Sequence, residues 1–135
     1  MRKIMTPMFD EVFYHDGRGP ELQRVIWSGG HFSDLFGFEY FNPDDKYEAS
    51  NLKHLRLKRV EAYAMAGEEV HGNILANSSS RAAIYRVEES DWMKSLNPYH
   101  LENCHHFQLI FYDEIFDVIC EEIIPGSGPL ADESA

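Results

Sequence analysis

The chain has 135 residues, of which 44% are hydrophobic and 26% are charged, and its formal net charge is −11. This length suits one domain with its own core, and the composition is that of a folded chain and not of a disordered one. The excess negative charge disfavours nucleic acid or an anionic membrane surface as a partner. We expect a single acidic domain over residues 1–124 and a frayed tail over 125–135, where glycine and proline accumulate.

Short runs of β-favouring residues, separated by turn signals, predict strands near 12–14, 22–27, 35–41 and 83–88. Gly37, inside the third run, suggests a bulge or a close approach of another backbone. Residues 52–66 contain several alanines that favour a helix, but Leu55 and Leu57 alternate with basic residues and no helical stripe emerges. We interpret residues 54–66 as a strand.

After these strands, Ser90 is a favourable N-cap for a short helix near 90–96, because its hydroxyl can accept an otherwise unpaired backbone N–H. A long β-hairpin follows over Cys104–Ile124. The pattern as a whole predicts an all-β or β-rich fold of about six antiparallel strands, folded into a sandwich or flattened barrel, with one short helix.

The hairpin is expected to turn at Asp113-Glu114, which would pair Phe111 with Phe116 and Phe107 with Cys120. Side chains alternate between the faces of a strand, so one face is expected to be core. The other face is mixed, and its apolar members Ile110, Tyr112, Ile115 and Ile119 are candidates for a ligand site or an interface.

In this register Cys104 and Cys120 lie on opposite faces, which excludes a disulfide between them. Two free thiols indicate a reducing compartment, and no apolar run suits a signal peptide or a membrane span, so we expect a cytoplasmic protein.

Charge is unevenly distributed, since residues 95–135 contain eight acidic residues and no lysine or arginine. Four basic residues cluster at Lys53, Arg56, Lys58 and Arg59. We expect this segment to lie near the acidic hairpin, and a patch for an anion or a partner is the alternative.

A metal candidate consists of Cys104, His106 and Glu121, because thiolate, imidazole and carboxylate all bind zinc-like ions. The predicted register places His106 opposite Glu121, although an exposed His–Glu pair explains the same pattern. His15-Asp16 and His31 with Asp34 are further His–carboxylate neighbours. The sequence contains no recognisable catalytic or cofactor-binding motif, and no cofactor is expected.

The segment Val87–Trp92, followed by His105–Phe107 and Phe116–Ile119, resembles small bacterial domains of unknown function that carry a V-E-x-S-x-W segment before a terminal hairpin. The resemblance covers the last third of the chain and the strand near 55–63. It implies a β-rich sandwich and brings no catalytic residues.

We expect a non-enzymatic binding or protein-interaction domain, either a homodimer or an immunity-like partner of an unknown, basic protein. A small metal-dependent or acid–base enzyme that uses the His–carboxylate pairs is the first alternative. A sandwich that holds an apolar small ligand between its layers is the second.

Overall fold

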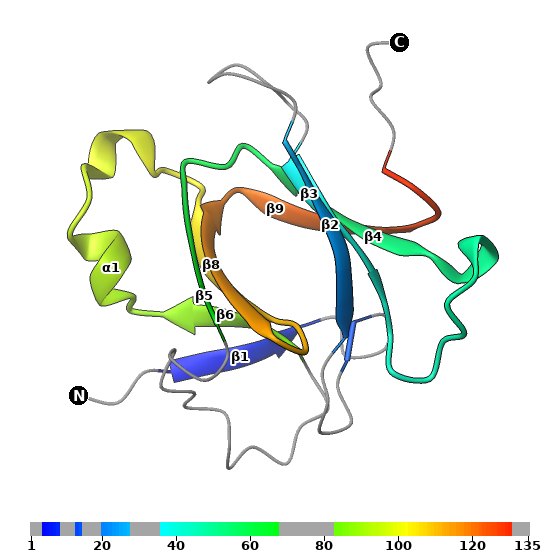
Figure 1. Ribbon diagram of the computed structural model, residues 1–135. Coiled ribbons are helices and arrows are strands. Elements are labelled where there is room, and N and C mark those ends of the chain that lie inside the picture. Colours follow the sequence, from blue (N-terminus) through cyan, green and yellow to red (C-terminus); the bar gives the residue numbers. More distant parts are fainter. Residues whose placement is uncertain (1–3, 9–12, 15–19, 28–35, 68–82, 131–135) are drawn as a thin grey trace, which may run out of the picture.

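The computed structural model describes residues 4–8, 13–14, 20–27, 36–67 and 83–130, and antiparallel strands dominate this part of the chain (Figure 1). One sheet has five strands in the order β1-β6-β7-β8-β5, and the other has four in the order β2-β3-β4-β9. The predicted sandwich class is confirmed, with more strands than expected. The strands are β1 (Ile4–Met8), β2 (Glu21–Trp27), β3 (Phe36–Phe41), β4 (Lys53–Lys58), β5 (Ala62–Gly67), β6 (Ile84–Glu88), β7 (His105–Ile110), β8 (Glu114–Cys120) and β9 (Glu122–Ser127).

The helical elements are short. They are η1 (Ala49–Asn51), α1 (Asp91–Lys94) and η2 (Pro98–His100). Within the described part of the chain, no helix has the length and apolar character needed to cross a membrane.

Aromatic side chains join the inner faces of the two sheets. Phe38 of β3 contacts Phe116 of β8 with ring centroids 4.8 Å apart, and contacts Phe111 at 5.4 Å. Phe13 adds edge-to-face contacts with Tyr40 and Phe111 at 4.8 and 5.1 Å. Such ring pairs stabilise a core beyond the area that they bury, so this cluster is the centre of the sandwich.

The predicted strand at 54–66 is wrong as a single strand, although its two halves, β4 and β5, are both strands. They lie in different sheets, and the chain turns between them at Arg59, which has a φ of 57°. The segment that pairs with them, β8–β9, bends at the same corner, where the N–H of Glu121 donates to the Lys58 carbonyl at 2.9 Å. One bent two-stranded ribbon, β4–β5 against β8–β9, therefore connects the sheets.

The same corner confirms that part of the basic segment lies beside the acidic hairpin. Lys58 and Arg59 approach the Glu121 carboxylate at 3.5 and 3.8 Å. These pairs are partly exposed, so each contributes at most about 1 kcal/mol.

The β7–β8 hairpin is confirmed, but its predicted register is wrong by two residues. Ile110 pairs with Ile115 and Phe107 with Val118, and the N–H of Phe111 donates to the Glu114 carbonyl at 2.8 Å. The turn residues are thus Tyr112 and Asp113. A shift of two residues leaves every side chain on its predicted face, so the predicted core face is still core.

The predicted frayed tail is wrong for residues 125–130. β9 runs to Ser127 in register with β4, and Leu130 is 7% exposed. The Nδ1–H of His54 donates to the Gly128 carbonyl at 2.9 Å, and Gly126 lies so close to the His54 ring that a side chain there would collide with it. Gly126 allows this close packing, so the domain extends at least to residue 130. Residues 131–135 lie outside the described part.

Gly37 makes the close backbone approach that the sequence suggested. A methyl group at this position would lie 2.5 Å from the carbonyl oxygen of Leu55 on β4 and would also collide with Leu130. Any larger residue would collide here, because β3 lies in close contact with both β4 and the C-terminal segment at Leu130.

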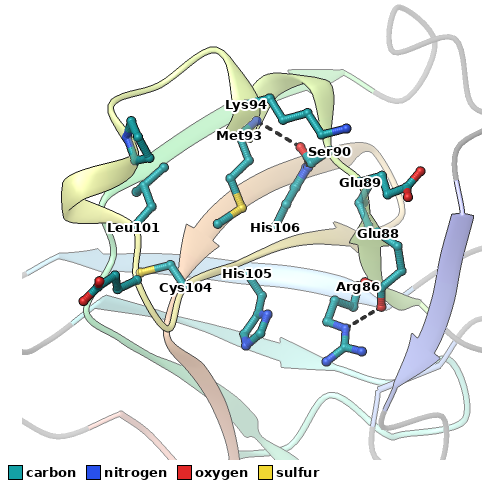
Figure 2. A pocket seen from close by; sticks show the side chains of 13 residues that line it. Arg86, Glu88, Glu89, Ser90, Met93, Lys94, Leu101, Cys104, His105 and His106 are labelled. Carbon is teal, nitrogen blue, oxygen red and sulfur yellow. Dashed lines mark hydrogen bonds and ion pairs between the residues drawn. The ribbon is translucent and has the colours of Figure 1, made fainter.

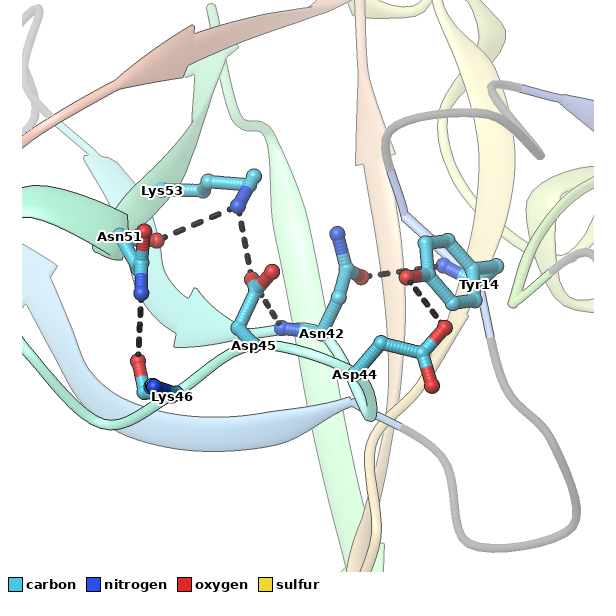
Figure 3. A network of polar contacts seen from close by, with 7 residues as sticks. All are labelled: Tyr14, Asn42, Asp44, Asp45, Lys46, Asn51 and Lys53. Carbon is cyan, nitrogen blue, oxygen red and sulfur yellow. Dashed lines mark hydrogen bonds and ion pairs between the residues drawn. The ribbon is translucent and has the colours of Figure 1, made fainter.

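Polar contacts fasten the loop that follows β3 to its neighbours (Figure 3). The Tyr14 N–H donates to Asn42 Oδ1 at 3.3 Å, and the Tyr14 hydroxyl donates to Asp44 Oδ2 at 3.1 Å. Asp45 Oδ2 accepts from the Asn42 N–H at 2.9 Å and from Lys53 Nζ at 2.7 Å. The loop is thus held between β4 and the short segment at residues 13–14.

Candidate functional site

The connection between β6 and β7 carries α1 and η2, and it projects from the five-stranded sheet on the side away from the four-stranded sheet (Figure 1). Ser90 begins α1 as its N-cap, with its Oγ accepting from the Met93 N–H at 3.1 Å. The predicted cap is confirmed, and the helix is shorter than expected because Ser95 already caps its C-terminus.

Ser90 also joins a buried chain of hydrogen bonds to the sheet. Its Oγ lies 2.6 Å from Nδ1 of His106 on β7, and Nε2 of His106 lies 2.7 Å from Oδ1 of Asp117 on β8. A carboxylate only accepts hydrogen bonds, so Nε2 carries the hydrogen. In the neutral ring Nδ1 then accepts from the Ser90 hydroxyl, whose oxygen still accepts from Met93.

A ring contact and a further hydrogen bond support this network. The Trp92 ring of α1 meets the His106 ring edge to face with centroids 5.2 Å apart. Gln108 Nε2 donates to the same Asp117 oxygen at 3.2 Å. Ser90 and His106 are 6% and 5% exposed, so the network fixes α1 to the outer face of the sheet at a dry position.

A cavity of about 400 Å³ lies next to this network, between α1, η2 and the ends of β6 and β7 (Figure 2). Ser90 and His106 form part of its wall. Its apolar lining comes from Val87, Met93, Pro98 and Leu101, with Cys104 beside them. This volume falls within the range of pockets that hold small ligands.

Charged groups surround the apolar lining. Arg86 is engaged with Glu88 through a 2.7 Å contact between Nε and Oε1. Glu89, Lys94 and Glu102 also line the pocket, and their side chains make no ion pair with the described residues. Among the glutamate, lysine and arginine side chains of the lining, three carboxylates face two cations, so these groups make the pocket slightly negative.

The predicted metal site is wrong, because the structure does not bring Cys104, His106 and Glu121 together. The register places His106 opposite Ile119, and both of its ring nitrogens already have partners. Glu121 lies at the corner, beside Lys58 and Arg59. Among the described residues, no group of three or more metal-binding side chains is assembled.

The predicted interface residues do not form an open apolar face. Ile110, Ile115 and Ile119 are 7%, 0% and 0% exposed, and only Tyr112, at the hairpin turn, is exposed at 45%. The prediction assumed that this face was uncovered, and it is wrong for the three isoleucines because the chain itself buries them. His15-Asp16 and His31 with Asp34 lie outside the described part of the chain.

Sequence reasoning found Ser90 as a helix cap and His106 as a candidate ligand, but did not connect them. It missed Asp117 because the expected register paired His106 with Glu121. It also missed the pocket, whose residues come from the ends of β6 and β7 and from the connection between them, with no recognisable spacing. The only signal for it was the cluster of Val87, Ser90 and Trp92 close to a histidine on the next strand.

Comparisons with known proteins add no relatives. No protein-family model matches the chain, and no match was found among curated proteins or solved structures.

Proposed function

We propose that this protein is a non-enzymatic binding domain that holds a small amphipathic molecule in the pocket between α1, η2 and the five-stranded sheet. The observation that carries the proposal is the combination of an apolar floor with charged side chains that make no ion pair with any described residue. The Ser90–His106–Asp117 network then serves to hold one wall of the pocket in place.

The charge of the pocket favours a ligand with an amine. Arg86 is paired with Glu88, whereas the carboxylates of Glu89 and Glu102 line the pocket and form no ion pair within the described part of the chain. The whole chain has a net charge of −11, which adds a long-range preference for cations. An apolar body would contact Met93 and Leu101, and its ammonium group would face the two glutamates.

Matched small molecules test this proposal. We expect 2-phenylethylamine to bind and 3-phenylpropionate, which has a similar body and the opposite charge, to bind more weakly in calorimetric titration. Glu89→Gln and Glu102→Gln should each weaken amine binding by up to about fivefold, because an exposed ion pair contributes at most about 1 kcal/mol.

Glu48→Gln is the matched control, since Glu48 is exposed and lies outside the pocket. It makes the same change in net charge and should leave binding unchanged. Equal affinity for the amine and the carboxylate, or equal effects of all three substitutions, would contradict the proposal.

Ester hydrolysis at Ser90 is the second candidate function, favoured by the two short contacts that join Ser90, His106 and Asp117. In that reaction Nδ1 of His106 would take the hydroxyl proton as Oγ attacks the ester carbonyl, and the departing alcohol would receive it, leaving the acyl group on Ser90. Water, with its proton taken by the same Nδ1, would then attack the acyl carbonyl, and that proton would return to Ser90 Oγ as the carboxylic acid leaves. It ranks second because Ser90 Oγ is also held by the Met93 N–H. Turnover of p-nitrophenyl acetate that Ser90→Ala abolishes and Ser95→Ala retains would favour this function.

We also propose that the protein works in a reducing, cytoplasmic compartment and that it does not bind nucleic acid. Its two buried free thiols support a reducing compartment, and its net charge of −11 disfavours binding to the phosphate backbone of nucleic acid.

A further inference from the structure

Judged from the described residues, β5 is the least protected edge strand of the two sheets. Each sheet has two edges, formed by β1 and β5 in one and by β2 and β9 in the other. Proline or charge normally protects an edge from pairing with another chain. Such residues are present as Pro7 in β1, Arg24 in β2 and Pro125 in β9. β5 reads AYAMAG, contains neither type, and pairs only with β8 among the described residues.

An exposed apolar patch lies beside this edge. Tyr63 and Met65 of β5 are 47% and 57% exposed, and Val25 and Trp27 of β2 are 42% and 56% exposed. The rings of Trp27 and Tyr63 meet edge to face, 6.2 Å apart, so the two strands form one surface. We call these four residues the open-edge patch.

The patch belongs to the inner side of the sandwich. Tyr63 is opposite Val118 and Trp27 is opposite Phe36, and both of these partners are buried in the core. The core therefore reaches solvent between β2 and β5. A surface of this kind, next to an unprotected edge, is suited to the addition of a strand from another chain.

Charge and sequence indicate that the added strand comes from a second copy. Two chains with a net charge of −11 repel each other, so a surface without charge lets them approach at the least electrostatic cost, and β5 and the open-edge patch contain no charged residue. A basic partner would instead select an acidic surface. β5 also alternates small residues on one face with Tyr63 and Met65 on the other, so antiparallel pairing about a twofold axis places like faces together.

We infer that two copies of this chain associate through antiparallel pairing of their β5 strands, with the open-edge patches of both copies next to the new pair. The two five-stranded sheets then become continuous across the dimer. This association uses a different surface from the ligand pocket, so each can be tested without the other.

Multi-angle light scattering over a range of protein concentrations tests the association. The full chain should shift from monomer to dimer mass, and higher salt should strengthen the dimer because it screens the repulsion between copies. Ala64→Lys, on the exposed β5 strand, should raise the dissociation constant by about tenfold or more. The matched control Ile124→Lys places the same charge on the exposed side of edge strand β9 and should leave the dimer intact.

Amide hydrogen exchange of residues 62–67 gives a second measurement that does not depend on a variant. Exchange there should slow as protein concentration rises, while residues 122–127 remain unaffected. A monomer at every concentration, or a dimer that survives Ala64→Lys and leaves exchange in β5 unchanged, would overturn the inference.

Discussion

Glu39 shows how one buried carboxylate ties distant parts of the chain together. Its Oε1 accepts from Arg24 Nε at 2.6 Å, and its Oε2 accepts from the backbone N–H of Leu130 at 2.7 Å. The hydrogen bond from Arg24 lowers the pKa of Glu39, the Leu130 N–H adds to this, and burial opposes both. The ionised form of Glu39 is therefore the form that stabilises the fold.

This pKa shift predicts a dependence of stability on pH. Because the folded pKa is lower than the unfolded one, the contribution of Glu39 is complete above about pH 4.3 and is lost as the pH falls through the folded value. We expect Glu39→Gln to reduce the free energy of unfolding by about 1 to 2 kcal/mol at neutral pH, a modest value because Arg24 is exposed.

Urea unfolding at neutral and acidic pH measures this effect. The difference between Glu39→Gln and the natural chain should shrink in acid, where both side chains are uncharged. Glu48→Gln, at an exposed position, should change stability little at either pH. A Glu39→Gln effect that is the same at both pH values would contradict the assigned role.

At the scale of elements, α1 depends on Ser90 for its attachment to the sheet. A four-residue helix has almost no stability of its own, so its position must come from its cap and its contacts. Ser90→Ala removes the bond to the Met93 N–H and leaves Nδ1 of buried His106 without its partner. We expect a loss of about 1 to 3 kcal/mol in the free energy of unfolding.

Ser95→Ala is the control from the same helix. Ser95 Oγ donates to the Trp92 carbonyl at 2.6 Å, but it is exposed and solvent can replace the bond, so the loss should be below about 0.5 kcal/mol. Urea unfolding measures both variants, and hydrogen exchange should show faster opening of residues 91–95 only in Ser90→Ala. Equal effects of the two substitutions would show that the network does not position α1.

Local sequence patterns predicted several elements correctly. The strands near 22–27, 35–41 and 83–88 and the Ser90 cap depend on alternation and capping chemistry that act within a few residues. The sequence pattern leaves residues 1–11 ambiguous between an arm and a first short element, and the structure forms β1 there. Its Pro7 is tolerated because β1 is an edge strand.

The remaining errors concern features that only tertiary structure decides. Nothing local places the bend at Arg59 or moves the hairpin turn to Tyr112-Asp113. The segment at residues 125–129 has the composition of a turn, but Gly126 packs against His54 and pairs with it as part of strand β9. The candidate site fails to emerge from the sequence for the same reason, since the contact of His106 with Asp117 depends on the hairpin register.

At the scale of the whole molecule, the bent ribbon makes the two sheets one cooperative unit. β4–β5 and β8–β9 each contribute to both sheets, so neither sheet can separate without breaking the ribbon at its corner. Cys104 and Cys120 lie near this corner, are free, and are 5% and 0% exposed. Cys104 also lines the ligand pocket, so it is the reaction of Cys120 with a thiol reagent that should report opening of the whole sandwich.

Burial raises the pKa of Cys120 to about 12, with a smaller contribution from Cys104, whereas an unfolded cysteine has a pKa near 8.5. The thiolate is the reactive form, so the folded protein at about pH 8 should react with Ellman's reagent at the rate of global unfolding. Because the folded pKa is raised, the protonated thiol stabilises the fold below about pH 8.5, and this contribution is lost as the pH rises toward 12. Cys104→Ala isolates Cys120, whose labelling should accelerate with urea in step with unfolding. Rapid labelling of Cys120 without denaturant would mean that the corner opens on its own, and the sheets would then not form a single cooperative unit.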